Sequence, residues 1–350
     1  MNDIKTQKQY YYWIDNIKCF ACILVALGHF WMSMIASNLQ KENIAYNLII
    51  QSIYTFHVPL FFVCSGFLYQ KSNKVHSFKS WGENIFDKAL NLGVPYFTFT
   101  LITFLMKAVF SSSVNNQNGN IIRTLFISPT APYWFLYALF FLFLFVPCMN
   151  SRKQAYILLI VAFVLKGANI ILVTNKIHLP NILNYITGLL IWFSIGIFIS
   201  FDVDLSKIPI KTIMIILISA AVTTCAFVYQ HQISNEAIKF LIGIMFVIGI
   251  VIAAGNLNNK KLNDVCHKYS KYFMPVYLMH TIFAAGIRIL LMKLGITNLI
   301  VHIIFGVSFS FILPMLIYKF CTKIPIFMFF ISPKKAIQLK EERRNNEFEF

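Results

Sequence analysis

Charged residues are scarce in this sequence of 350 residues, where they make up only 12% of the chain. Soluble domains usually hold about 25%, so half of the charge expected for a water-exposed surface is missing. Hydrophobic residues make up 58% instead, and the mean hydropathy is +0.68. Helices that face lipid need apolar residues on all sides, whereas a soluble helix needs one apolar stripe. The composition therefore excludes an ordinary soluble protein and predicts a membrane bundle.

Several features of soluble or secreted proteins are also absent. The seven cysteines are odd in number and lie mostly within or beside apolar runs, which argues against a disulfide framework. Cys19 and Cys22 form a CxxC, but no second pair follows at zinc spacing, so we expect no metal site. The sequence has no P-loop or Rossmann glycine pattern and no strong internal repeat. It also lacks a cleavable signal peptide, so we expect the first apolar run to be retained as a signal anchor.

Acidic residues are few, and their distribution relative to the basic ones predicts the topology. The chain holds 30 Lys and Arg against 13 Asp and Glu, a net charge of +17. The basic residues lie mostly in short loops between apolar runs, which favours anionic lipid over nucleic acid as the partner. With the N-terminus inside, the inner segments hold about twenty basic residues and the outer ones about five. Both termini are therefore predicted to be cytoplasmic, in a multi-pass protein of the plasma or inner membrane.

About ten apolar runs are long enough to cross a bilayer. We predict an all-α polytopic protein with one transmembrane domain over residues 1–333. The apolar segment between Pro325 and Pro333 is too short to span and is expected to lie at the interface, and residues 334–350 are expected to form a charged, solvated cytoplasmic tail. The expected spans are 13–36, 46–69, 84–110, 132–150, 154–174, 182–200, 210–230, 237–255, 271–293 and 297–320.

The first expected span carries three ionisable residues, Asp15, Lys18 and His29. Lys18 and His29 are eleven residues apart, which is about 16 Å and three turns of helix, so they lie on nearly the same face. Ionisable groups at membrane depth are costly unless they face protein or a wet cavity, which favours a functional role for this pair. Two alternatives remain open: Lys18 can extend to the interface, and His29 can serve as an interhelical hydrogen-bond donor.

Four segments, in this order, resemble the motifs of acyltransferase family 3, a family of membrane proteins. The N-terminal stretch YWIDNIKCFACILV is especially similar to the branch of small O-acetyltransferases that act on surface polysaccharides. Together the motifs cover nearly the whole chain. They are Lys18 and His29 with ten residues between them, FHVPLFFVCSGF (Phe56–Phe67), PYWFLYAL (Pro132–Leu139) and PVYLMH (Pro275–His280).

The resemblance implies a membrane O-acyltransferase, most simply one that moves an acetyl group from acetyl-CoA to a hydroxyl of a cell-envelope or exported glycan. The acceptor could also be a lipid-linked sugar, and no bound cofactor is expected. An imidazole that titrates near neutral pH can take a hydroxyl proton, so His29 is the expected general base. Lys18 is expected to attract the anionic acyl-CoA from the cytoplasmic side. Two alternatives are a transporter or flippase for a glycan or small solute, and a sensing or scaffold module.

The expected donor site departs from the family pattern in one place. The family often carries an Arg-x-x-Arg pair before the Pro-Tyr of its third span, where this chain has Lys88 and Asn91. Lys88 can supply one positive charge for the donor phosphates, but the bidentate fork of arginine is missing. By resemblance, Trp134 also lines the donor site, although it could be only an interfacial aromatic residue.

Three further residues of the first two spans are candidates for lining the cavity. Asp15 could pair with Lys18 one turn later, or only stabilise the start of its helix. His57 lies just before Pro59, whose missing N–H disturbs the helix. Ser65 lacks a neighbouring base in the sequence, so a packing or cavity-lining role is favoured over a nucleophilic one.

The ninth span holds two more candidates, His280 and Arg288, which are eight residues apart and share a helix face. Arg288 is not expected to face lipid and could bind an anionic acceptor. Two lysines in other spans are less easily placed. Lys107, near a span end, is expected to extend to the interface, whereas Lys166 lies deeper and has no evident partner.

Overall fold

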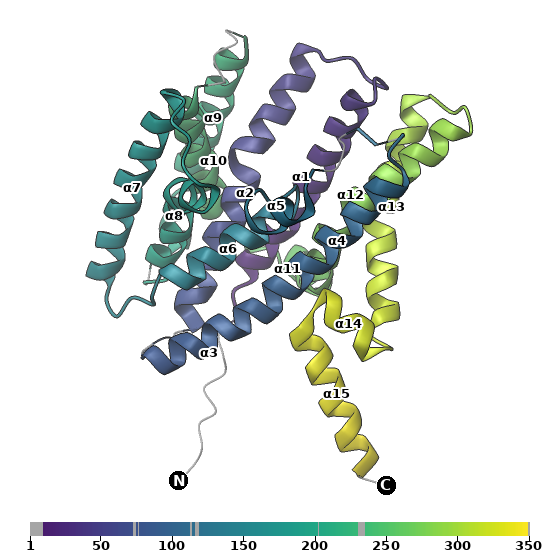
Figure 1. The fold of residues 1–350 in the computed structure, drawn as a ribbon. Helices are drawn as coiled ribbons and strands as arrows, with labels where there is room; N and C mark the ends of the chain where they lie inside the picture. The colour runs from purple at the N-terminus through teal and green to yellow at the C-terminus, as the bar shows by residue number, and fades with distance from the viewer. Residues whose placement is uncertain are drawn as a thin grey trace.

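The computed structural model describes residues 10–72, 75, 77–112, 114–115, 119–201, 203–229 and 235–348. Lys5, Lys8 and Lys74, which contribute to the charge pattern, lie outside these residues, as do parts of the loop expected at 111–120. Within the described residues the chain folds into helices and contains no strand. Figure 1 shows most of the long helices side by side as a bundle. The predicted all-α polytopic architecture is therefore confirmed.

Nine helical segments of the described chain are long and apolar enough to cross a membrane. Two of them are composite: α3 (Phe78–Lys88) continues into α4 (Val94–Val109), and α11 (Lys260–Tyr269) continues into α12 (Phe273–Lys293). The other seven are single helices, namely α1 (Tyr12–Ala36), α2 (Ile44–Ser72), α7 (Arg152–Thr174), α8 (Asn181–Ile199), α9 (Ile210–Tyr229), α10 (Glu236–Asn256) and α13 (Leu299–Cys321).

The fourth apolar run, expected to span over 132–150, is the one that differs. It forms only α6 (Trp134–Phe145), a helix of 12 residues that is about 18 Å long. Pro132 and Pro147 limit it on either side because proline removes a backbone donor and restricts the residue before it. α6 is preceded by the shorter helix α5 (Ile121–Phe126). Nine segments of the described chain are therefore long enough to cross a membrane, and the remaining apolar run forms only the short helix α6.

The long segment from α3 to α4 contains a turn of π-helix, η1 (Ala89–Gly93), and crosses the front of the bundle at a tilt in Figure 1. Such wide turns inside α-helices occur frequently at functional sites. Short 3-10 turns, η2 (Leu205–Lys207) and η3 (Ser270–Tyr272), lead toward α9 and α12. Lys88 and Asn91, where the chain departs from the family pattern, therefore lie at this wide turn.

Two glycines bring α2 and α8 into direct backbone contact. A Cβ atom on Gly66 would lie 2.0 Å from the carbonyl oxygen of Phe193, and one on Gly196 would lie 2.0 Å from that of Val63. No larger residue fits at either position without moving a backbone. In this structure the glycine of the FHVPLFFVCSGF segment serves packing, and Ser65 beside it is half-buried.

The C-terminal region forms two helices, one over the expected interfacial segment and one over the charged tail. α14 (Pro325–Ile331) is seven residues long, too short to span, and it buries Met328 and Ile331. Residues expected to be a solvated tail form α15 (Pro333–Phe348). Its first turn contacts η1, where the Lys334 N–H donates to Asn91 Oδ1 at 3.3 Å. The side chain of Lys334 lies 3.9 Å from Asp87. The beginning of the charged tail is therefore anchored to the long α3–α4 segment.

Candidate functional site

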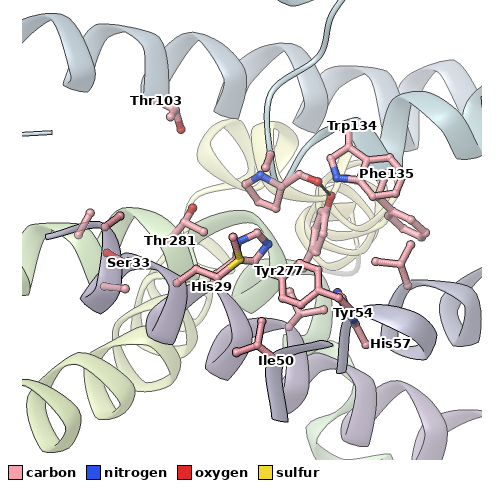
Figure 2. A pocket seen from close by; sticks show the side chains of 18 of the residues that line it. His29, Ser33, Ile50, Tyr54, His57, Thr103, Trp134, Phe135, Tyr277 and Thr281 are labelled. Carbon is pink, nitrogen blue, oxygen red and sulfur yellow. Dashed lines mark hydrogen bonds between the residues drawn. The ribbon is translucent and has the colours of Figure 1, made fainter. Parts of the chain in front are cut away.

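A cavity of about 990 Å³ lies inside the bundle, and His29 lines it. Its walls come from α1, α2, α4, α6, α7, α8, α10 and α12. Figure 2 shows His29, Tyr54, His57, Trp134 and Tyr277 around this space, contributed by helices far apart in the sequence. Most of the lining is apolar, and the polar groups are few and specific. This combination is typical of a site that binds a small molecule or a substrate segment.

His29 projects from α1 beside a second histidine of α12. The centres of the His29 and His280 rings are 5.3 Å apart. His280 is buried, and its Nδ1 lies 3.0 Å and 2.9 Å from the carbonyl oxygens of Val276 and Tyr277. Because carbonyl oxygens only accept, Nδ1 of His280 must carry the proton when the ring is neutral. Its Nε2 is then an acceptor, and it has no hydrogen-bond partner within the described residues.

α2 supplies a further part of the wall, next to His29. The Tyr54 ring is 6.2 Å from the ring of His29 and 4.8 Å from that of His57, edge-on to both. His57 is buried, with its Nδ1 2.6 Å from the Ile53 carbonyl oxygen. This contact fixes the proton on Nδ1 of His57 for the reason given for His280. Tyr54 thus separates two histidines that both line the cavity.

Arg288 lines the cavity one layer away from the histidines. It is 3% exposed, and its Nη1 donates to the carbonyl oxygen of Ser33 at 3.2 Å and to the Ser33 hydroxyl. Ser33 follows His29 by four residues on α1, and Arg288 follows His280 by eight on α12, so both pairs join the same two helices. Contact between α1 and α12 therefore builds this part of the site.

The segment that leads into α6 is held against α12. The Tyr277 hydroxyl donates to the carbonyl oxygen of Pro132, and the Tyr133 hydroxyl donates to that of Leu278 at 3.0 Å. Next to this segment, Trp134 lines the cavity and stacks on Tyr185 of α8 at 5.6 Å. The apolar segment expected to span at this point instead forms a wall of the cavity.

The second residue of the sequence pair, Lys18, does not line this cavity. It is half-buried on α1 and lies close enough to Cys64 of α2 to interact with it electrostatically. Lys88 is also outside the cavity, with its Nζ 4.4 Å from the centre of the Phe143 ring. Ser65 is absent from the lining as well. The structure therefore brings His29, His57, Trp134 and Arg288 together, with His280 behind them, and leaves the two lysines elsewhere.

Asp15 belongs to a separate polar cluster at the beginning of α1. It accepts a hydrogen bond from the Tyr10 hydroxyl, and its carboxylate lies 3.1 Å from Nδ1 of His267 on α11. Asn16 donates to Asn263 of the same helix at 2.7 Å. Burial and the Asp15 carboxylate raise the pKa of the Tyr10 phenol above its ordinary value. These contacts join α1 to α11 and make Asp15 a residue of that junction.

Several lining residues were not predicted from the sequence, above all Tyr54, Ser33, Glu236 and Lys239. Tyr54 is three residues before His57 and Ser33 is four residues after His29, so helical spacing alone could have indicated both. Glu236 and Lys239 open α10 and carried no comparable signal. They line the cavity only because α10 packs beside α2 and α7.

The fold and the site define a multi-pass helical membrane protein with a cavity lined by histidines. The chain matches the family model described as an acyltransferase domain, acyltransferase family 3, over residues 11–319. It belongs to this family and is a multi-pass membrane acyltransferase. No curated protein and no solved structure matches it.

Proposed function

We propose that the protein transfers an acetyl group from acetyl-CoA to a hydroxyl of a cell-envelope or exported glycan, with His29 as the general base. The observation that carries this proposal is the position of His29 in a cavity of about 990 Å³ within a membrane acyltransferase. The cavity is large enough for a sugar unit beside the end of an acyl-CoA arm. Membership of an acyltransferase family favours this activity over transport of the same glycan.

The surroundings of His29 support a role in proton transfer. Among the described residues no hydrogen bond occupies its ring, so one nitrogen is open to a substrate in the cavity and the other is available to the neighbouring His280. A general base must lie within hydrogen-bond reach of the proton that it removes. A glycan hydroxyl that enters the cavity reaches His29 without displacing a protein partner.

His280 has the geometry of a positioning residue for this base. Its Nε2 is a buried acceptor that lacks a partner among the described residues, and buried polar atoms are normally paired. A separation of 5.3 Å between ring centres is compatible with a nitrogen-to-nitrogen hydrogen bond of about 3 Å. An N–H of His29 donated to His280 would direct the lone pair on the other nitrogen into the cavity. The second histidine thereby selects the tautomer of the first, as the orienting residue does in other catalytic arrays.

In the proposed reaction, the glycan oxygen attacks the thioester carbonyl carbon while His29 removes the hydroxyl proton. The tetrahedral oxyanion collapses, the C–S bond breaks, and the thiolate of CoA leaves with the proton returned by the His29 imidazolium. The products are an acetyl ester and CoA. Tyr54, whose ring is 6.2 Å from His29, is the candidate hydrogen-bond donor to the oxyanion. One such donor typically contributes about 10²- to 10³-fold to the rate.

The donor is proposed to approach from the end of the bundle at which α1 begins, past Lys18. Lys18 precedes His29 by about 16 Å along the helix. The phosphates of acetyl-CoA would then be attracted by Lys18 while the extended pantetheine arm carries the thioester toward His29. The charge pattern of the loops supports a cytoplasmic position for this end, on the side from which acetyl-CoA would come, in a protein of the plasma or inner membrane.

The decisive experiment supplies labelled acetyl-CoA to membranes that contain the wild type, His29→Ala or His178→Ala. His178 is an exposed histidine outside the helices and provides the matched control. We expect His29→Ala to reduce labelling of envelope glycans by about 10²- to 10⁴-fold, the range for a lost general base, while His178→Ala labels as the wild type does. Equal labelling by all three proteins would refute the role of His29. Absence of labelling by the wild type would refute the acetyl donor or the glycan acceptor.

A further inference from the structure

Four basic side chains and one carboxylate line the cavity, from four different helices. The basic residues are Lys107 on α4, Lys166 on α7, Lys239 on α10 and Arg288 on α12, and the acid is Glu236. Glu236 pairs with Lys239, with its Oε1 2.9 Å from the lysine Nζ. One cation is thus neutralised within the wall. The remaining three leave the cavity with a net positive charge in a region where charged groups are costly.

Arg288 is the deepest of these cations and retains unused hydrogen-bonding capacity. Its Nη1 donates to Ser33, but its Nε is buried and has no hydrogen-bond partner among the described residues. No carboxylate of the described chain forms an ion pair with it. Burying a guanidinium without a counter-charge costs several kcal/mol unless a ligand or solvent compensates it. An arginine in this state is suited to a carboxylate or phosphate, which guanidinium groups bind with good geometry.

Lys166 is a second cation that lines the cavity, contributed by α7. It lies in the second half of α7, half-buried, with its Nζ 5.5 Å from the centre of the Phe240 ring. Within the described residues no carboxylate lies within 4 Å of its ammonium group, and Glu236, which already pairs with Lys239, interacts with it only at longer range. The aromatic face stabilises the ammonium partly and leaves its charge available to the cavity. Arg288 and Lys166 therefore face one space from separate helices, and the single Glu236 carboxylate is shared between Lys239 and Lys166.

These charges lie far from the proposed entrance of the donor. Ser33, which holds Arg288, follows Lys18 by fifteen residues on α1, which is about 22 Å along the axis. In Figure 1, α1 and α12 run toward the upper end of the bundle, where α10 begins. The charge pattern of the loops predicts that this end faces outward. Cations here are therefore placed to meet the acceptor rather than the phosphates of a cytoplasmic donor.

We propose that the acceptor is an anionic glycan, one that carries carboxylate or phosphate groups, and that Arg288 and Lys166 bind its charge. This inference rests on the proposed function and names the substrate class of the same cavity. The bound anion supplies the negative charge that Glu236, already paired with Lys239, does not provide for Arg288 and Lys166. Its charged group also fixes the glycan in the cavity, so that a neighbouring hydroxyl can lie against His29.

The test measures binding to the purified full chain in lipid nanodiscs, without any turnover. The probes are trigalacturonate, a neutral galactose trisaccharide and glycerol phosphate, with CoA measured in parallel. We expect the wild type to bind an acidic probe, trigalacturonate or glycerol phosphate, at least about ten-fold more tightly than the neutral trisaccharide, because a charge-assisted contact is worth that much. Arg288→Gln and Lys166→Met should each lose most of this preference, whereas the exposed Arg123→Gln should keep it.

The outcomes separate the alternatives. Equal binding of acidic and neutral probes to the wild type, or an undiminished preference in both Arg288→Gln and Lys166→Met, overturns the proposal. Weaker binding of CoA in these two variants, with unchanged binding of the acidic probes, overturns it in favour of a donor site. If Arg288→Gln does not fold, Lys166→Met decides alone. Because no acetyl transfer is measured, a failure of the proposed reaction would show in the labelling experiment and not here.

Discussion

The rings of His29 and His280 lie 5.3 Å apart, centre to centre, where α1 contacts α12. One ring lines the cavity, and the other is buried behind it with Nδ1 held by two backbone carbonyl oxygens. Backbone carbonyls cannot donate, so they determine which nitrogen of His280 is left to accept. The Nε2 that is left to accept belongs to the ring beside His29, which is why we assign His280 a positioning role in the proposed reaction.

Replacement of His280 should slow the reaction without abolishing donor binding. We expect His280→Phe to lower kcat by about 10²-fold, because a misplaced base loses about that much, with little change in the KM for acetyl-CoA. His280→Gln keeps a side-chain acceptor and should retain more activity than His280→Phe. The measurement is the rate of acetyl transfer as a function of donor concentration.

The pH profile distinguishes positioning from mere packing. Activity should fall on the acid side as His29 becomes protonated, since an imidazolium cannot accept a proton. This acidic limb should move in His280→Phe, because the neighbour of the titrating ring has changed. It should stay in place in His302→Phe, which alters a buried histidine outside the cavity. An unmoved limb with normal kcat in His280→Phe would remove the positioning role.

Lys18 is predicted to act on the donor rather than in the chemical step. Loss of one attractive charge in Lys18→Met should weaken the apparent affinity for acetyl-CoA by about five- to ten-fold, with a smaller effect at high salt. Lys211→Met changes an exposed lysine at the start of α9 and serves as the control. Donor titrations of both variants check this. If Lys18→Met has the affinity of the wild type, Lys18 does not attract the donor.

The contact between α2 and α8 should not tolerate a methyl group. In Gly66→Ala the new Cβ would meet the Phe193 carbonyl oxygen at 2.0 Å, so a backbone must shift, at a cost of at least about 1–3 kcal/mol. Gly82→Ala, in α3, places its Cβ in open space and should be neutral or slightly stabilising. Thermal unfolding of the purified proteins in detergent compares the two. Similar unfolding temperatures would mean that the helices can separate at no cost.

The Tyr10–Asp15 hydrogen bond should stabilise the junction of α1 with α11. We expect Tyr10→Phe to lower the free energy of unfolding by about 1 kcal/mol. The folded protein raises the pKa of Tyr10, so its contribution is complete below the ordinary phenol pKa of about 10. It is lost only as the pH rises through the higher folded value. The difference between wild type and Tyr10→Phe should therefore persist up to about pH 9 and shrink in stronger alkali.

Much of the architecture was already determined by the order of apolar and polar residues. Long apolar runs must become helices in a bilayer because every backbone donor needs a partner there. Nine of the ten expected runs form spanning segments. The exception, 132–150, is bounded by Pro132 and Pro147, and a hydropathy pattern does not measure how far a helix extends between them. The charged tail was predicted only as solvated, and its secondary structure was not predicted: residues 333–348 form a helix whose first turn docks on η1.

The sequence by itself determined that His29 stands at membrane depth, because helical rise and the apolar run around it leave no other position. Only the tertiary structure decided which residues share its cavity. Lys18 lies on nearly the same helix face but does not line the cavity, because the lining depends on which other helices pack against each part of α1. His280 and Arg288 are more than 250 residues away in the chain, and only the packing of α12 against α1 brings them to His29 and Ser33. The helical period shows which residues of α1 share a face. Which residues then form a site depends on the other helices that pack against that face.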